Sequence, residues 1–245
     1  GVIDPFNGLE DIKNRIIRTV GNPNDRFKED ALRMLRAIRF SAQLDFAIES
    51  DTLEAIKNNN RLIRNISFER IRDELTKILT SSHPGKFVLL KDTNLLEHIM
   101  PEFGACFETP QNNPYHLYNV AEHILKAVSE IENEEILRWT MLLHDIGKPV
   151  TRTTDGKGID HFYGHAEESV RISDKILRRL KFNKKSTDII LRLITHHDRL
   201  IEPDGKAVRK AVSAVGIDIF EDLLKVKKAD NQAQNHELCR EKLEN

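Results

Sequence analysis

The segment Leu142-Leu143-His144-Asp145-Ile146-Gly147-Lys148 ends an apolar stretch with an adjacent histidine and aspartate. Apolar residues from Ile136 to Leu143 have the spacing of a helix, so the pair is expected where that helix ends. Gly147 is expected to let the backbone turn away from the pair. The second half of the chain is therefore interpreted as a helical scaffold built around His144 and Asp145.

Further residues that can bind a metal lie at intervals on either side of this pair: His123, His165, His196, His197 and Asp230. Neutral imidazole and carboxylate groups suit first-row divalent metals, and adjacent helices can bring such groups together. A metal held there would lower the pKa of bound water and neutralise phosphate oxygens, as phosphoester hydrolysis requires. Lys148, one turn beyond the pair, is placed to contact a phosphate.

Each of these residues also has an ordinary structural explanation. A single histidine on an amphipathic helix is more often a core or surface residue than a ligand, and Asp230 alone would be a solvated acid. The order of the whole set is what favours a metal site. His116 and His161 lie outside that order and are left out of the ligand set, although His161 is close enough to the end of a polar loop to contact a substrate.

The order His, His-Asp, His, His-His, Asp resembles the HD superfamily of metal-dependent phosphohydrolases over about residues 115–235. The resemblance implies a helical domain in which a metal is held by His123, His144, Asp145 and Asp230. Additional ligands of the binuclear members are expected from His165, His196 and His197, so one or two ions are possible, with Mn, Ni, Co, Fe and Mg as candidates. Some relatives keep the fold for packing alone, but the intact ligand set favours catalysis by His144, Asp145 and Lys148.

A second pattern, Glu29-Asp30-Ala31-Leu32-Arg33-Met34-Leu35-Arg36, lies in a stretch whose apolar residues from Phe27 to Phe40 predict one long helix. On that helix Asp30 and Arg33 would be neighbours on one face. An isolated pattern of this kind is usually a solvated ion pair, worth roughly a few tenths of a kcal/mol. The alternative is base recognition, because an aspartate accepts from an exocyclic amine while an arginine donates to a ring nitrogen or carbonyl oxygen. Cytosine and adenine satisfy both groups, whereas uracil and guanine satisfy neither.

Three segments around this pattern, 4–11, 26–40 and 67–75, resemble in order the later motifs of bacterial tRNA nucleotidyltransferases, the CCA-adding enzymes and their poly(A) polymerase relatives. The resemblance implies that Asp30 and Arg33 select CTP or ATP, that Glu29 and Arg36 support them, and that the RNA partner is the 3′ end of a tRNA or another RNA. Glu69 and Arg70 are then mainly structural. The catalytic head of that family, which holds Mg on a DxD pair, has no counterpart in this sequence. We therefore expect a fragment of a longer enzyme that does not transfer nucleotides by itself.

Helical periodicity recurs along almost the whole chain and predicts an all-α fold. We expect two domains, with residues 1–105 as hinge, neck and body and residues 106–245 as the HD domain. The boundary is placed in the proline-bearing stretch 101–114, which has no helical period. Residues 9–20 are expected to form one helix, and residues 149–163 a polar loop over a site.

Composition adds a few limits. Among the 245 residues, 38 Lys and Arg nearly balance 39 Asp and Glu, so a nucleic-acid site would have to be local. The two cysteines, Cys106 and Cys239, form no disulfide framework. No apolar run approaches the roughly 20 residues that span a bilayer. A cytoplasmic chain without a membrane partner is expected.

Three functions remain open at this point. The first is the nucleotide-selecting and RNA-binding part of a tRNA nucleotidyltransferase, with an HD phosphohydrolase domain attached. The second is a stand-alone HD phosphodiesterase or phosphatase, and the third is a non-enzymatic RNA-binding module. The sequence does not distinguish CCA addition from CC, A or poly(A) addition, and it gives no oligomeric state.

Overall fold

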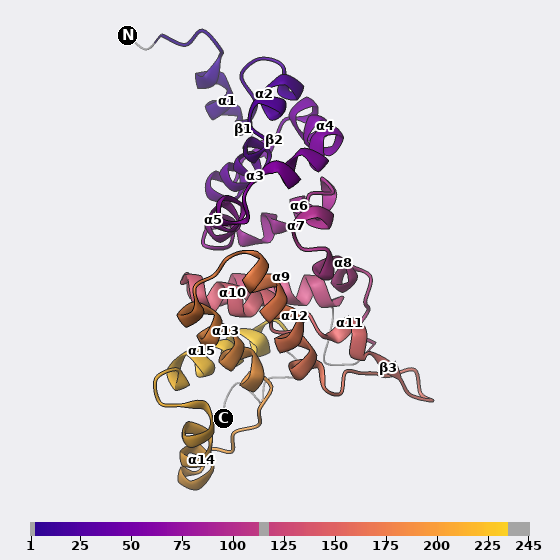
Figure 1. Ribbon diagram of the computed structural model, residues 1–245, viewed down its shortest axis with the longest axis vertical. Coiled ribbons are helices and arrows are strands. Elements are labelled where there is room, and N and C mark those ends of the chain that lie inside the picture. The colour runs from indigo at the N-terminus through magenta and orange to yellow at the C-terminus, as the bar shows by residue number, and fades with distance from the viewer. Residues whose placement is uncertain (1–2, 113–117, 235–245) are drawn as a thin grey trace. The chain divides into compact units, whose positions relative to one another are not determined.

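The computed structural model describes residues 3–112 and 118–234 (Figure 1). Helices dominate, and the strands form two sheets of two strands each, so the all-α prediction is confirmed. The chain divides into two compact units, one ending at Pro101 and the other beginning at Glu102. No helix among the described residues is both long and apolar enough to cross a bilayer. His116 and Cys239 lie outside the described residues.

The first unit is a set of short helices around α3 (Leu32–Leu44) and α5 (Phe68–Leu79), which pack on each other. Leu35, Ile38, Leu75 and Ile78 of these two helices are fully buried. Its elements in chain order are α1 (Gly8–Asn14), β1 (Ile16–Ile17), α2 (Pro23–Glu29), α3 (Leu32–Leu44), β2 (Ala47–Ile48), α4 (Ser50–Asn59), η1 (Asn60–Asn65), α5 (Phe68–Leu79), η2 (Pro84–Val88), α6 (Leu89–Asp92) and α7 (Leu96–Ile99).

The single helix expected over residues 9–20 is wrong. Helix α1 ends at Asn14, because Arg15 adopts a left-handed conformation with φ 58°. The following residues form β1, which pairs in parallel with β2 through Ile16 and Ala47. A partner strand thirty residues away therefore decides the conformation of apolar residues whose spacing alone suggested a helix.

The long helix expected from Phe27 to Phe40 is also wrong, because the chain breaks at Asp30. Asp30 is extended, with φ −149° and ψ 104°, and separates α2 from α3. Its carboxylate accepts a hydrogen bond from the backbone N–H of Leu32 at 3.1 Å. Aspartate competes with helical backbone bonds in this way, and the cost of the break is offset by the turn it stabilises.

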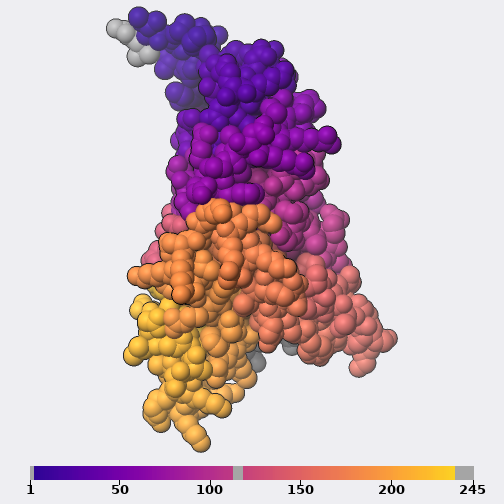
Figure 2. All heavy atoms as spheres, viewed as in Figure 1, coloured from indigo at the N-terminus to yellow at the C-terminus, as the bar shows by residue number. Residues whose placement is uncertain are grey.

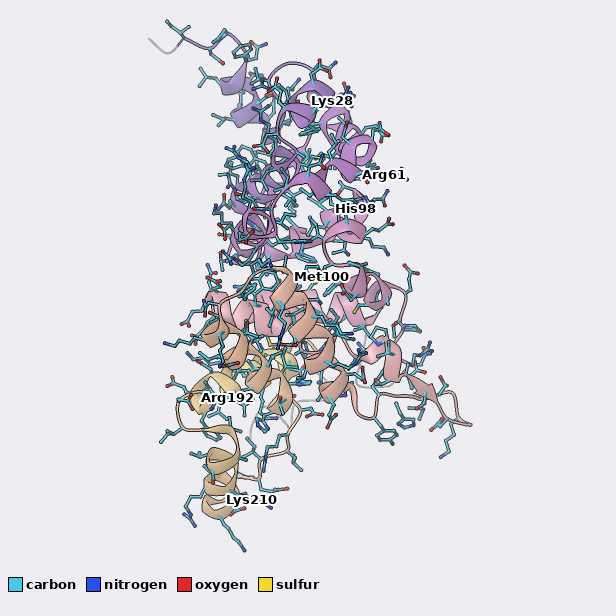
Figure 3. All side chains as sticks on the ribbon, viewed as in Figure 1. Lys28, Arg61, His98, Met100, Arg192 and Lys210 are labelled. Atoms are coloured by element: carbon cyan, nitrogen blue, oxygen red, sulfur yellow. The ribbon has the colours of Figure 1, made fainter. Side chains whose placement is uncertain are left out.

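The second unit is a helical bundle in which α9 packs on α10, and α13 packs on α10 and α12. Its elements are α8 (Pro101–Phe107), α9 (Val120–Glu130), α10 (Glu135–Leu143), α11 (Lys148–Thr151), β3 (Thr153–Thr154), β4 (Asp160–His161), α12 (His165–Arg179), α13 (Lys184–His196), α14 (Gly205–Val215) and α15 (Phe220–Gln232). Arg192 of α13 (Figure 3) donates to Asp218 at 2.8 Å and to the carbonyl of Val215 at 2.6 Å, which ties the end of α14 to the bundle.

Two irregular stretches expected in this region contain regular structure. Residues 101–107 form α8, since a proline is tolerated in the first turn of a helix. The predicted loop 149–163 contains α11 and an antiparallel hairpin in which Thr153 pairs with His161. The hairpin stands out from the surface of the second unit (Figure 2).

Gly147 is needed for a reason other than the one expected. Its φ of −82° and ψ of −15° are open to any residue, so the turn after Asp145 does not require glycine. A Cβ there would lie 2.5 Å from the carbonyl oxygen of His165 and 2.5 Å from the amide nitrogen of Ser169. The Gly147 N–H donates to the Ser169 hydroxyl at 2.9 Å, so the first turn of α12 rests directly on this backbone.

Candidate metal centre

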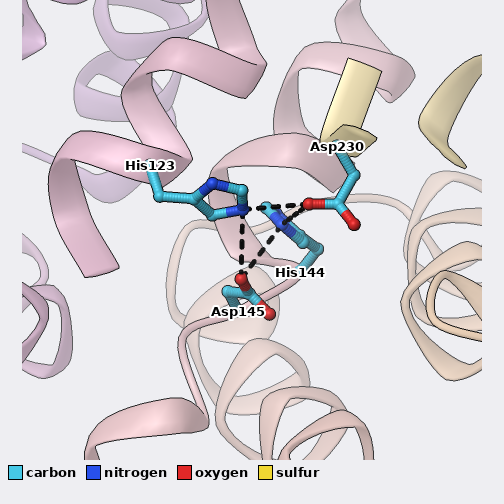
Figure 4. Close-up of side chains that lie close together, drawn as sticks. All are labelled: His123, His144, Asp145 and Asp230. Carbon is cyan, nitrogen blue, oxygen red and sulfur yellow. Dashed lines mark hydrogen bonds and ion pairs between the residues drawn. The ribbon is translucent and has the colours of Figure 1, made fainter. Parts of the chain in front are cut away.

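Four side chains from three helices converge in the interior of the second unit (Figure 4). His123 lies on α9, His144 and Asp145 follow the last turn of α10, and Asp230 lies on α15. His123 Nε2 is 2.9 Å from Asp230 Oδ1 and 3.4 Å from Asp145 Oδ2. His144 Nε2 is 3.4 Å from the same Asp230 oxygen and 3.3 Å from Asp145 Oδ2. We call these four residues the first ligand group.

A second ligand group consists of Asp145, His165 and His197. His165 begins α12, and His197 directly follows the last residue of α13. Their Nε2 atoms are 3.4 and 3.6 Å from Asp145 Oδ1 and 3.2 Å from each other. Asp145 thus faces the first group with Oδ2 and the second with Oδ1, the arrangement that lets one carboxylate bridge two cations.

The outer ring nitrogens of three histidines are held by backbone carbonyls. Nδ1 of His144 lies 2.7 Å from the oxygen of Met141, Nδ1 of His197 lies 2.7 Å from Ile194, and Nδ1 of His165 lies 2.9 Å from Phe162. A carbonyl can only accept, so Nδ1 carries the proton in each ring and Nε2 is directed at the cluster. Each carbonyl comes from three residues earlier in the chain. Those of Met141 and Ile194 belong to the last turns of α10 and α13, and that of Phe162 lies in the turn before α12.

The donor atoms fit a divalent cation. His144 Nε2 is buried and makes no hydrogen bond to any residue of the described ranges, although two carboxylates lie near it. Burial lowers the pKa of His144, but Asp145 and Asp230 outweigh burial and raise that pKa to about 10. Protons therefore balance the carboxylates in the metal-free chain, and a cation bound at Nε2 would take the place of that proton.

The pKa shifts of the other residues of the cluster are consistent with the replacement of this proton by a cation. Burial raises the pKa of Asp145, yet His144 and Lys148 together hold that pKa well below its usual range. The pKa of Asp230 is likewise held well below its usual range, because His123 and His144 outweigh the effect of burial. Burial lowers the pKa of His165, and His197 lowers it further, which favours the neutral imidazole that a metal requires.

A pocket of about 390 Å³ opens beside the two groups. The cluster contributes Asp145, His165, His197 and Asp230 to its wall, and Lys148 lies next to them. Lys148 is buried, with Nζ 2.6 Å from Asp145 Oδ2, and it donates to Gln111 Oε1 at 2.9 Å. It therefore lies at the edge of the cluster, in the wall of the pocket.

Most of the predicted ligands meet here, and His196 does not. His196 belongs to neither ligand group of the described chain and lies half-exposed at the end of α13, one residue before His197. Adjacent residues on a helix point about 100° apart, so only one of the pair can face the cluster. His161, which was left out of the predicted set, lines the pocket together with Phe162 and Tyr163. Their only signal in the sequence was their place at the end of the polar stretch.

The residues expected to select a nucleotide lie in the first unit but do not form the predicted pair. Arg33 donates to Glu29 at 2.6 Å, and Glu29 also binds Arg26 at 2.8 Å. Asp30 instead pairs with Arg70 of α5 at 3.0 Å. Burial raises the pKa of Asp30, but the Leu32 N–H and Arg70 outweigh it and lower that pKa. Asp30 and Arg33 are therefore not joined on one helical face, since the break at Asp30 turns them apart.

A pocket of about 460 Å³ nevertheless adjoins Asp30. Glu29 and Arg70 share its wall, whereas Arg33 is not among the residues that line it. The side chain of Arg36 is exposed on α3 and makes no hydrogen bond or ion pair with the part of the chain that the structure describes. Arg70, expected to be mainly structural, thus lies closer to the carboxylate than either predicted arginine.

Comparison with protein families matches both units of the chain. Residues 45–106 match a family described as a probable RNA and SrmB-binding site of polymerase A, and residues 115–235 match the HD domain. The two matches follow each other along the chain and leave only residues 1–44 and short stretches outside.

Relatives of known name agree with these matches. The CCA-adding enzyme of Lactobacillus helveticus is 48% identical over 114 residues, 46% of this chain and 28% of that enzyme. The A-adding tRNA nucleotidyltransferase of Deinococcus radiodurans is 30% identical over 244 residues, 95% of this chain and 55% of that protein. The crystal structure of the Bacillus stearothermophilus CCA-adding enzyme in complex with CTP is 28% identical, with a TM-score of 0.65 over 99% of this chain and 52% of that one.

The chain spans about half the length of these relatives or less. The similarity nonetheless covers both units of the chain, which themselves match the RNA-binding and HD families. The chain therefore belongs to the CCA-adding enzyme family, of which it carries the region with the poly(A) polymerase-type RNA-binding domain and the HD domain.

Proposed function

We propose that the second unit is a metal-dependent phosphohydrolase with two cation positions. The observation that carries this proposal is the shared carboxylate: Asp145 places one oxygen 3.3–3.4 Å from His144 and His123, and the other 3.4–3.6 Å from His165 and His197. Cations held by these residues would lower the pKa of a bound water, so that it can act as nucleophile, and would neutralise phosphate oxygens.

The residues of the chain have distinct roles in this proposal. The first cation is held by His123, His144, Asp145 and Asp230, and the second by Asp145, His165 and His197. Lys148 binds a non-bridging phosphate oxygen. Its ion pair with Asp145 also keeps the Asp145 carboxylate ionised. Asp230, whose side chain remains 17% exposed and lines the pocket, is placed to accept a proton from the attacking water.

Hydrolysis of simple phosphomonoesters and phosphodiesters by the purified chain tests this proposal. With Mn, Ni, Co, Fe or Mg offered in turn, at least one metal should support hydrolysis, and a chelator should abolish it. Lys148→Met should lower the rate at saturating metal while leaving metal binding largely intact. If the protein binds metal yet hydrolyses none of the esters, the HD unit is a structural scaffold and the proposed hydrolytic function is wrong.

We also propose that the first unit selects CTP and ATP and contacts the tRNA 3′ end in a tRNA nucleotidyltransferase. The names of the relatives and the polymerase-type RNA-binding match support this assignment. The pocket beside Asp30 offers a carboxylate and a guanidinium, from Asp30 and Arg70, within 3.0 Å of each other. Arg33 would join them only if the Arg33–Glu29 ion pair opened, with Glu29 and Arg36 as its supports.

Nucleotidyl transfer itself is proposed to lie outside this chain. Transfer requires carboxylate-held Mg ions beside the triphosphate. The ligand groups that the described chain contains are both in the second unit.

Titration with CTP, ATP, UTP and GTP tests the selection of the base. Asp30→Ala should bind CTP and ATP more weakly than the parent chain does, and Asp25→Ala, which removes an exposed acid of the same segment, is the matched control. If Asp30→Ala bound CTP and ATP as tightly as Asp25→Ala does, Asp30 would have no part in the selection of the base.

A further inference from the structure

The ammonium group of Lys148 is held on three sides. Its Nζ lies 2.6 Å from Asp145 Oδ2, donates to Gln111 Oε1 at 2.9 Å and lies 5.4 Å from the centre of the Phe162 ring. An ammonium carries three N–H groups, and the two oxygens take up two of them. A third N–H is therefore left for an acceptor in the pocket, whose wall Lys148 lines.

Gln111 holds this ammonium group from behind the pocket wall. It is 6% exposed and is not among the described residues that line the pocket. Its Nε2 donates to the carbonyl of Tyr118 at 3.2 Å, while its Oε1 accepts from Lys148. A carbonyl can only accept and an ammonium can only donate, so both partners require the same orientation of the amide. The oxygen of Gln111 is thus directed at Lys148.

The segment that carries Gln111 is anchored by a buried acid. The N–H of Asn112 donates to Asp160 Oδ2 at 2.9 Å, and the carbonyl of Asn112 accepts from the Asp160 N–H at 3.0 Å. The other carboxylate oxygen of Asp160 accepts from Thr154 Oγ1 at 2.7 Å and pairs with Arg152 Nε at 3.1 Å. Asp160 belongs to neither ligand group of the described chain. Its carboxylate instead fixes the backbone directly beside Gln111.

A glutamine suits this position better than an acid would. The pocket wall already carries the carboxylates of Asp145, Asp160, Asp198 and Asp230. A further carboxylate beside Lys148 would add negative charge, and its attraction for the ammonium would oppose the binding of a phosphate oxygen. The neutral amide accepts a hydrogen bond from Lys148 without adding charge to the site.

We infer that Gln111 is a positioning residue for the proposed hydrolysis. It holds the ammonium of Lys148 beside Asp145 so that one N–H is left for a phosphate oxygen in the pocket. Gln111 lies before the residues that match the HD domain, 115–235, so the site includes a part of the chain that this match does not cover. The assignment rests on the proposed function of the second unit, because Lys148 acts there on a phosphate.

Binding of inorganic phosphate to the metal-loaded chain measures this role without requiring hydrolysis. Gln111→Leu should weaken phosphate binding by about tenfold, the order expected when a hydrogen bond to a charged group is lost. The affinity for Mn should change by less than about threefold, since a larger loss is typical of residues that orient a metal ligand. A general loosening of the cluster would weaken the binding of both phosphate and Mn.

A second substitution shows whether Gln111 acts through Lys148. In a Lys148→Met background, Gln111→Leu should change the phosphate affinity by less than about twofold, because the group that Gln111 positions is gone. Gln111→Asn keeps the amide but is one carbon shorter, so it cannot reach Tyr118 and Lys148 together. It should lose phosphate affinity as Gln111→Leu does, and it takes the place of that variant if the apolar side chain prevents folding. Gln43→Leu, which changes an exposed glutamine of α3, is the control and should bind phosphate like the parent chain.

Two results would overturn the assignment of Gln111. One is an equal loss of phosphate affinity by Gln111→Leu in both backgrounds, and the other is a parent chain that binds no phosphate when Mn is offered. Hydrolysis of esters is measured separately. If phosphate binding depends on Gln111 only while Lys148 is present, but no ester is hydrolysed with any metal, the positioning role stands and the proposed hydrolytic function falls. If esters are hydrolysed and the losses from the two substitutions add, the hydrolytic function stands and the role of Gln111 falls.

Discussion

Replacing Gly147 by alanine should both destabilise the second unit and weaken one of the two cation positions. The new Cβ would lie 2.5 Å from two backbone atoms of α12, at His165 and Ser169. Ordinary carbon contacts need about 3.5 Å, so the backbone must separate by about 1 Å. Overpacking of this kind costs roughly 1–3 kcal/mol, and the hydrogen bond from Gly147 to Ser169 would be strained as well.

The displacement also reaches the metal centre. His165 begins α12, and its Nε2 is 3.4 Å from Asp145 Oδ1. A shift of about 1 Å at this helix end would spoil the second ligand group, whereas His123, His144 and Asp230 come from other helices. We therefore expect the cation held by the second ligand group to lose about tenfold or more in affinity in Gly147→Ala, similar to the loss of a ligand-orienting contact.

Urea denaturation of the metal-free chain, followed by calorimetric metal titration, measures both effects. Gly104→Ala is the matched control, because no described atom lies within 4 Å of its Cβ position and the residue is inside α8. Alanine there should stabilise by about 0.5–1 kcal/mol through helix propensity. If Gly147→Ala were as stable as the parent chain and bound metal equally well, the close approach of α12 would not be what requires glycine.

Two other predictions concern the first unit. Arg39→Met should lower the free energy of unfolding by about 3 kcal/mol, because the Glu74 carboxylate, 6% exposed, then keeps Lys77 as its one ion-pair partner among the described residues. Arg15→Ala, which removes the exposed Arg15–Asp45 ion pair, should cost less than about 1 kcal/mol in the same urea titration. Burial, and then Arg64, lowers the pKa of His98 (Figure 3), whose Nε2 is 2.6 Å from Asn60 Oδ1. The unfolded chain therefore binds this proton more readily, so the contribution of His98 to stability is present above its ordinary pKa of 6.5 and is lost as the pH falls through the lower folded value. His98→Gln should flatten the pH dependence of stability between pH 5 and 7, and an unchanged slope would contradict this.

The metal centre could be anticipated from the sequence because its ligands lie at predictable places on helices. His144 and Asp145 follow one predicted helix, and His123 and Asp230 lie on others. The order of these residues along the chain, and its resemblance to the HD superfamily, is what grouped them as ligands. The sequence did not allow a choice between His196 and His197 as the ligand, since adjacent residues on a helix differ only in the direction in which their side chains point. That direction depends on how α13 packs, which is a tertiary property.

The errors in the first unit have a common physical origin. Ile16 and Ile17 have apolar spacing that suits a helix, but pairing with residues 47 and 48 supplies backbone hydrogen bonds that the local sequence does not show. Asp30 appeared to be a surface position on a helix, but its own carboxylate ends the helix and then binds Arg70. The role of Gly147 was likewise invisible, because a requirement for close approach depends on a helix twenty residues later.

The central claim is that Asp145 serves two cation positions, and counting bound metal tests it most directly. Elemental analysis after dialysis against Mn or Ni should find two ions per chain, two in His196→Ala, about one in His123→Ala and in His197→Ala, and none in Asp145→Ala. Retention of one ion by Asp145→Ala at full occupancy, or a parent chain that binds no metal at all, would contradict the shared carboxylate and the hydrolytic function built on it.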